Sequence, residues 1–157
     1  GGGHAMAAGF TLEEQRLQGF TKFMQEEVRH QLQGDALAPQ LSLDGALAAS
    51  AVTTDLISEL DCVAPFGAGN DEPRFAVVDV KVSKVGVVGS GHVRCFLSGR
   101  SGGHVKAIAF NSADSELGHI LLTAAGRRLH VAGTIRADNW QGRNGVQLII
   151  DDAALAQ

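Results

Sequence analysis

Apolar and polar residues alternate along the second half of the chain with a period of two, which is the spacing of a half-buried β-strand. In the run 92–99, for example, Val93, Cys95 and Leu97 fall on one face. Runs with this alternation recur at 74–84, 92–99, 104–111, 128–137 and 145–151. We therefore predict five strands whose apolar faces point toward a common core.

A polar segment, residues 112–125, separates the third and fourth runs and is compatible with a helix. Five strands with one helix between the third and the fourth are the element order of the oligonucleotide-binding (OB) fold, a small antiparallel β-barrel. We expect this barrel over residues 74–157. The outward residues of its second and third strands would form an exposed platform, which comprises Arg94, Phe96, His104 and Lys106.

The first part of the chain has a helical period instead. Between residues 11 and 33, five apolar residues recur at spacings of three or four and share one stripe of a helix. They are Leu17, Phe20, Met24, Val28 and Leu32. Thr11 and Glu14 have the spacing of a capping box at the start of this helix. An apolar stripe that stays exposed favours a homodimer, which is one expectation for this segment.

Short elements are predicted between this helix and the barrel. Two strands, 40–43 and 46–52, would be joined by a hairpin turn at Asp44-Gly45. A second helix would begin at Thr53 or Thr54 and end at Ala64, because Pro65 disfavours helix in the residue before it. The expected fold class is α+β, a mainly helical segment followed by a five-stranded antiparallel barrel.

The net charge of −4 conceals two opposite halves. Through Pro73 the chain has 3 basic and 11 acidic residues, whereas from Arg74 onward it has 10 basic and 6 acidic ones. A basic β-module attached to an acidic segment is suited to hold a polyanion on one side only. The alternative is a chance asymmetry between two solvated surfaces.

The two cysteines, Cys62 and Cys95, lack the CxxC or His partners of a metal site. We expect both to be buried free thiols in a reducing compartment. No apolar run approaches the length of a transmembrane helix, and no basic region followed by an apolar stretch opens the chain. These observations predict a cytoplasmic protein without a membrane partner.

A glycine run, Gly1-Gly2-Gly3-His4, opens the chain, and Ala7-Ala8-Gly9-Phe10 follows it. Glycines let backbone N–H groups approach a phosphate closely, and a neighbouring His can add a hydrogen bond or charge. The stretch resembles the GGGH signature of the DHHA1 substrate-binding domain in DHH-superfamily phosphoesterases; a cloning remnant is the alternative. The resemblance implies that Gly1, Gly2, Gly3 and His4 contact the terminal phosphate or nucleotide of a substrate.

A second motif lies between the helical and β-rich parts. Residues 65–75 have the sequence PFGAGNDEPRF, whose outer prolines and inner glycines predict a structured connector with Phe66 as an anchor. This stretch is similar to the PFGxGNPEPxF motif of RecJ-type single-strand-specific exonucleases, with Asp71 where the family usually has Pro. Together with the glycine motif and the strands that follow, it extends the resemblance over the whole chain, as the C-terminal portion of such a protein.

The resemblance implies an activity that this chain does not carry alone. In the family, a DHH domain holds manganese or magnesium through Asp and His clusters and hydrolyses single-stranded DNA from the five-prime end, in repair and recombination. No Asp-His-His motif occurs here, so we expect an inactive piece without a cofactor of its own. The resemblance assigns 1–64 to the end of a DHHA1-like domain with a connecting helix, 65–73 to the connector and 74–157 to the OB domain.

Single strands are held without sequence preference when cations follow the backbone and aromatic rings stack on bases. The candidates for nucleic-acid binding on the predicted strands and loops are Lys81, Lys84, Arg94, Phe96, Arg100, Lys106, Arg136, Asn139, Trp140 and Arg143. Trp140 could instead plug the barrel mouth, and Phe96 could pack on the N-terminal segment. Phe110 is predicted to belong to the core.

Two other functions stay open from sequence. A basic OB surface also suits an acidic peptide, so the barrel could dock a protein such as the acidic tail of the single-stranded-DNA-binding protein. The third hypothesis is a DHH phosphoesterase for small nucleotides, which the appended barrel disfavours.

Overall fold

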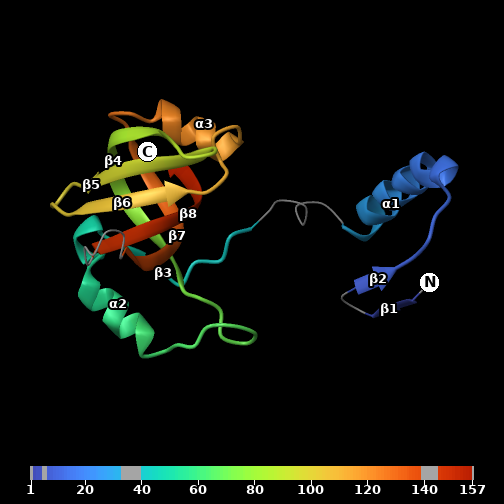
Figure 1. Ribbon diagram of the computed structural model, residues 1–157, viewed down its shortest axis with the longest axis horizontal. Helices are drawn as coiled ribbons and strands as arrows, with labels where there is room; N and C mark the ends of the chain where they lie inside the picture. Colours follow the sequence, from blue (N-terminus) through green and yellow to red (C-terminus); the bar gives the residue numbers. More distant parts are fainter. Residues whose placement is uncertain (1, 5–6, 33–39, 139–144, 157) are drawn as a thin grey trace. The chain divides into compact units, whose positions relative to one another are not determined.

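The structure is a computed structural model that describes residues 2–4, 7–32, 40–138 and 145–156 (Figure 1). The chain forms two compact units, Gly1–Leu41 and Ser42–Gln157. Six of the 11 acidic residues that precede Pro73 therefore belong to the same unit as the basic strands. The assignment of residues 1–64 to a DHHA1-like domain stays a prediction.

The first unit contains a two-stranded ribbon and one long helix. Strand β1 (Gly2–His4) pairs antiparallel with β2 (Ala7–Gly9). A 3-10 turn, η1 (Glu14–Arg16), leads into α1 (Leu17–Gln31). The predicted helix is present, but the capping box is wrong. The turn begins after Glu13, whose side chain makes no capping hydrogen bond, so Thr11 lies outside the helix.

The second unit is built on a closed five-stranded barrel. Its elements are β4 (Arg74–Val88), β5 (His92–Gly99), β6 (His104–Ala109), α3 (Glu116–Thr123), β7 (Arg128–Asp138) and β8 (Gly145–Leu155). The strand order is β4-β5-β6-β8-β7, and pairing of β7 with β4 closes the barrel. The β6 and β8 strands are parallel and the other neighbours within the barrel are antiparallel. The predicted OB topology is confirmed.

The alternation of apolar residues explains the core. Val93, Cys95 and Leu97 of β5 are fully buried, as the sequence pattern predicts, and face the small inward residues of β6. Strand β4 shifts register at two places, which lets one long strand curve and pair with both β5 and β7. On β7 a shift occurs beside Gly133, where a Cβ would lie 1.8 Å from the carbonyl oxygen of Ile149. Only glycine allows the two strands to approach this closely.

One strand before the barrel differs from the prediction. Strand β3 (Gly45–Leu47) pairs in parallel with the start of β4, so Asp44-Gly45 is not a hairpin turn. Asp44 instead holds Arg74: its N–H donates to the carbonyl of Arg74, and its carboxylate accepts the N–H of Arg74 at 2.8 Å. These contacts join the acidic segment to the barrel.

The next elements pack on the ends and outside of the barrel. The 3-10 turn η3 (Ala49–Ala51) lies against the β5–β6 loop, where a Cβ on Gly103 would meet the backbone of Ser50 at 2.4 Å. Helix α2 (Thr54–Asp61) begins as predicted, since Thr53 accepts the N–H of Leu56, but it ends three residues before Ala64. Figure 1 shows α2 and α3 at opposite ends of the barrel.

The connector after α2 is ordered by its own hydrogen bonds. The side-chain amide of Asn70 donates through Nδ2 to the carbonyls of Val63 and Pro65, both at 2.9 Å.

Cys62, at the end of α2, is exposed, so its predicted burial is wrong, whereas that of Cys95 is confirmed. Among the described residues no helix is long and apolar enough to cross a bilayer.

Candidate nucleic-acid interface

One row of outward side chains crosses all five strands of the barrel. Lys84 on β4 is in register with Phe96 on β5, which is in register with Lys106 on β6. Lys106 is in turn opposite Gln147 on β8, and Gln147 is opposite Arg136 on β7. Residues directly opposite on neighbouring strands project to the same face. We call these five residues the outer row; at about 4.8 Å per strand, it follows the curved barrel wall for roughly 19 Å.

Where the row crosses β4 and β5, the ring of Phe96 is flanked by open cations. Phe96 is 38% exposed, and the guanidinium carbon of Arg94 lies 5.8 Å from its ring centroid, within the range of a cation–π contact. Lys81, Lys84 and Arg94 are exposed and form no ion pair within the described part of the chain. Their charges are available to a ligand.

The other end of the row is already paired with carboxylates. Lys106 donates to Asp138 at 2.5 Å, and these side chains are 32% and 17% exposed. Arg136 makes a two-pronged contact with Glu72, one prong at 2.8 Å. Hydrogen bonding from Arg136 lowers the pKa of Glu72, and the same bond raises the pKa of Arg136. This carboxylate competes with any anion for Arg136.

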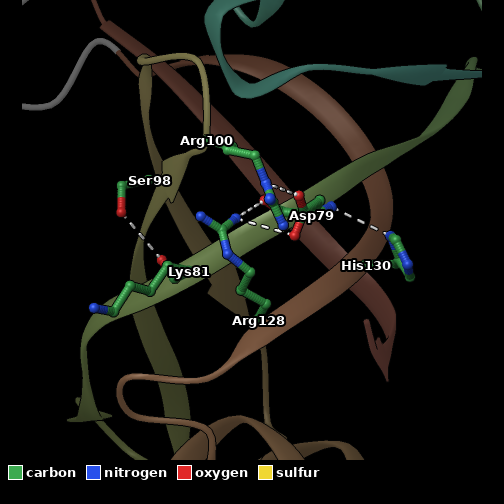
Figure 2. Close-up of polar contacts among 6 residues, drawn as sticks. All are labelled: Asp79, Lys81, Ser98, Arg100, Arg128 and His130. Atoms are coloured by element: carbon green, nitrogen blue, oxygen red, sulfur yellow. Dashed lines mark hydrogen bonds and ion pairs between the residues drawn. The ribbon is translucent and has the colours of Figure 1, made fainter. Parts of the chain in front are cut away.

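A second cluster of charges lies at the bulge of β4 (Figure 2). Asp79 has a left-handed backbone (φ 49°), and its N–H donates to Nδ1 of His130 at 3.2 Å. Its carboxylate accepts Arg100 at 2.8 Å and Arg128 at 3.0 Å, and its carbonyl also accepts Arg128. The hydrogen bond from Arg100 holds the pKa of Asp79 below its usual range.

This cluster serves the fold more than a ligand. It fixes a non-glycine residue in a conformation that costs about 1 kcal/mol, at the point where β4 changes register. Arg100, a predicted binding residue, is thereby engaged by Asp79. Figure 2 shows that Lys81 is directed away from Asp79, and its backbone carbonyl accepts the hydroxyl of Ser98.

The predicted binding residues thus divide into groups. Four of them, Lys84, Phe96, Lys106 and Arg136, come together in the outer row, and Arg94 and Lys81 lie beside it. Arg100 lies apart. Asn139, Trp140, Arg143 and Gly1 lie outside the described residues, while Gly2, Gly3 and His4 form β1 of the first unit.

Sequence reasoning missed two outward residues. Gln147 has no charge to attract notice, although its alternation within the fifth strand places it outward. The prediction that Phe110 belongs to the core is wrong: it follows the last residue of β6 and is 51% exposed.

Acidic residues are concentrated away from the open cations. Strands β5 and β6 contain none. Helix α2, which packs on β7 and β8, exposes Asp55, Glu59 and Asp61. The described residues contain no cluster of side chains suited to a metal ion. The open cations of β4 and β5 therefore form the part of the barrel suited to a polyanion.

Comparison with known proteins is consistent with this geometry. A family model described as the RecJ OB domain matches residues 43–152. The single-stranded-DNA-specific exonuclease RecJ of Bacillus subtilis is 26% identical over 158 residues, covering 99% of this chain and 20% of the relative. The Escherichia coli protein of the same name is 29% identical over 152 residues, covering 96% and 26%. The chain thus spans about a fifth to a quarter of the length of these relatives.

A solved structure supports the fold. The crystal structure of RecJ in complex with Mn2+ from Thermus thermophilus matches with a TM-score of 0.66 and 22% identity. The match covers 99% of this chain and 22% of that chain.

Proposed function

Since the chain belongs to the RecJ OB domain family, we propose that its barrel binds single-stranded DNA along the outer row. The observation that carries the proposal is the position of Phe96 between two open cations: Lys84 is opposite it on β4, and the guanidinium of Arg94 lies over its ring. Exposed cations beside an aromatic ring are what a single strand needs, because phosphates pair with the cations and bases stack on the ring.

We further propose that the chain is the strand-holding part of a larger enzyme. The relatives are named as single-stranded-DNA-specific exonucleases and are about four to five times as long. In such a parent, hydrolysis would proceed five-prime to three-prime in repair and recombination, with manganese or magnesium held by a separate DHH domain. This chain alone is expected to hydrolyse nothing. Nuclease activity of the purified chain with added manganese would contradict that expectation.

Binding can be tested by titrating a labelled oligothymidylate at several salt concentrations. Lys84→Ala should weaken binding and reduce the slope of log affinity against log salt by about 0.7 if it contacts one phosphate. Phe96→Ala should cost about 1–3 kcal/mol, because one stacked base is lost, with little change in the salt slope.

Lys22→Ala is the matched control, because Lys22 is an exposed helical lysine of the first unit. It should bind as the unchanged chain does. Binding that is insensitive to salt, or equal losses for Lys22→Ala and Lys84→Ala, would contradict the proposal.

The same titration separates the alternative of a protein ligand. An acidic peptide, such as the tail of the single-stranded-DNA-binding protein, would use the open cations but has no bases to stack. Phe96→Ala should therefore weaken oligonucleotide binding and spare peptide binding. The terminal-phosphate contact of Gly1 to His4 and the homodimer stay predictions.

A further inference from the structure

A second exposed aromatic ring lies on the same outer face as Phe96. Phe110 packs edge-on against His92, with ring centroids 5.2 Å apart and planes at 76°. His92 is on β5 and is two residues before Arg94 and four before Phe96, so all three project outward. Phe110 follows β6 and comes four residues after Lys106, the partner of Phe96.

The exposure of these two rings is selective. Among the phenylalanines of the described second unit, Phe66 and Phe75 are half-buried, and only Phe96 and Phe110 are exposed. The two exposed rings share one face of β5 and β6, with Arg94 and Ile108 paired between them. Two exposed aromatic rings on one basic face are the combination that holds a nucleic-acid strand, because rings accept bases and cations accept phosphates.

Hydrogen bonds fix the backbone at Phe110, and His92 contacts its ring. The imidazole Nδ1 of His92 accepts the N–H of Asn111 at 3.0 Å, which stabilises the left-handed backbone of Asn111 (φ 50°). The hydroxyl of Ser112 donates to the carbonyl of Phe110 at 2.8 Å. The backbone that follows Phe110 is therefore held by two hydrogen bonds, and a ligand need not order it on binding.

We propose that Phe110, positioned by His92, is a second base-stacking platform for single-stranded DNA; this rests on the proposed function. Four residues along a strand separate the platforms by about 13 Å. That distance is about four times the roughly 3.4 Å rise per nucleotide of a stacked strand. The rings therefore take bases that are not neighbours, and Arg94 lies between them where the intervening phosphates pass.

The spacing gives a test based on oligonucleotide length. The full chain is titrated with a thymidine dinucleotide and with oligothymidylates of about 4 to 16 nucleotides, the range of OB-fold site sizes. Phe110→Leu should reduce affinity for the long oligonucleotides by about 5- to 150-fold, the range for one lost stacking contact. It should leave the weak dinucleotide affinity within about twofold, because a dinucleotide fills one platform and Phe96 remains. Phe110→Trp should restore the affinity for long strands.

The control is Leu155→Ala, which removes an apolar side chain of similar exposure (49%) at the end of β8. It should change affinity at no length. Thermal unfolding of each variant shows whether the barrel is intact, and an exposed residue such as Phe110 should tolerate Leu.

The remaining outcomes distinguish the two proposals. If the unchanged chain binds no oligonucleotide, both are overturned. If it binds, and Phe96→Leu weakens binding while Phe110→Leu has no effect at any length, the second platform is overturned and the proposed function stands. A loss in Phe110→Leu that is equal at every length, or one confined to an acidic peptide, also overturns the second platform.

Discussion

A single buried thiol shows how position changes the chemistry of a residue. Cys95 lies between Val85 and Ala107 in the barrel wall, and burial raises its pKa to about 11. The thiol of an unfolded chain ionises near pH 8.5. Between these two pH values the folded state keeps a proton that the unfolded state loses. The contribution of Cys95 to the free energy of unfolding is therefore fully present below about pH 8.5 and declines as the pH rises toward 11.

This linkage predicts a specific alkaline destabilisation. Between about pH 9 and pH 11, the contribution of Cys95 to the free energy of unfolding should fall by roughly 2–3 kcal/mol. Cys95→Ala should be less stable at neutral pH, because it leaves a small cavity, but it should lose less stability over this range. Denaturant unfolding at a series of pH values measures the difference, with Cys62→Ala, at an exposed thiol, as control. Parallel curves for the Cys95 variant and the unchanged chain would contradict the prediction.

At the scale of elements, the contact between β7 and β8 depends on one missing side chain. Gly133→Ala would place a methyl group where the carbonyl of Ile149 now lies, so the strands must separate at the register shift. We expect a loss of about 1–3 kcal/mol or more in stability. Gly86→Ala on β4 is the control, since nothing lies within 4 Å of its Cβ position. Thermal unfolding should show a much smaller change for the control; equal changes would rule out the steric explanation.

The elements also show where sequence patterns succeed. Alternation predicted β5 and β6 because one face of each is buried, which is the physical origin of the period of two. It could not predict β3, which pairs with a strand some 30 residues later and forms no local turn. Phe110 failed for a different reason: the alternation that places Ala107 and Ala109 inward places Phe110 outward, but its apolar side chain led to its assignment to the core.

The candidate site was predictable to a similar extent. Charge and alternation selected Lys84, Phe96 and Lys106, but not their alignment, because register depends on pairing between distant strands. Neither pattern could show that Arg100 and Arg136 are held by Asp79 and Glu72, since both ion pairs join residues far apart in sequence.

On the scale of the whole molecule, we expect Glu72 of the connector to limit how far a nucleic acid extends over the barrel. Glu72 comes from the connector and occupies Arg136, the last cation of the outer row. Glu72→Gln should release much of that charge and increase the affinity for single-stranded DNA several-fold, with a salt slope larger by about 0.7. Because Arg136 is 60% exposed, the loss of the pair should cost at most about 1 kcal/mol in stability.

Acid should break the ion pair between Arg136 and Glu72 as Glu72→Gln does, because it protonates the Glu72 carboxylate. The lowered pKa of Glu72 means that the pair stabilises the fold above the ordinary Glu value of about 4.3, and that this stabilisation is lost as the pH falls below it.

The control for the affinity measurement is Glu59→Gln on α2, which removes the same charge without a contact to Arg136. If Glu59→Gln and Glu72→Gln raised affinity equally, general charge and not release of Arg136 would be responsible.

The parallel pairing of β3 with β4 also decides where the chain can be divided. A protein shortened to begin at Arg74, where the composition changes, would lose the strand beside Phe75 and the backbone that covers Gly103. Division between Leu41 and Ser42 breaks no strand pairing among the described residues and keeps both. Limited proteolysis should therefore leave residues 42–157 as one fragment, and the barrel should be transferred to another protein together with residues 42–73.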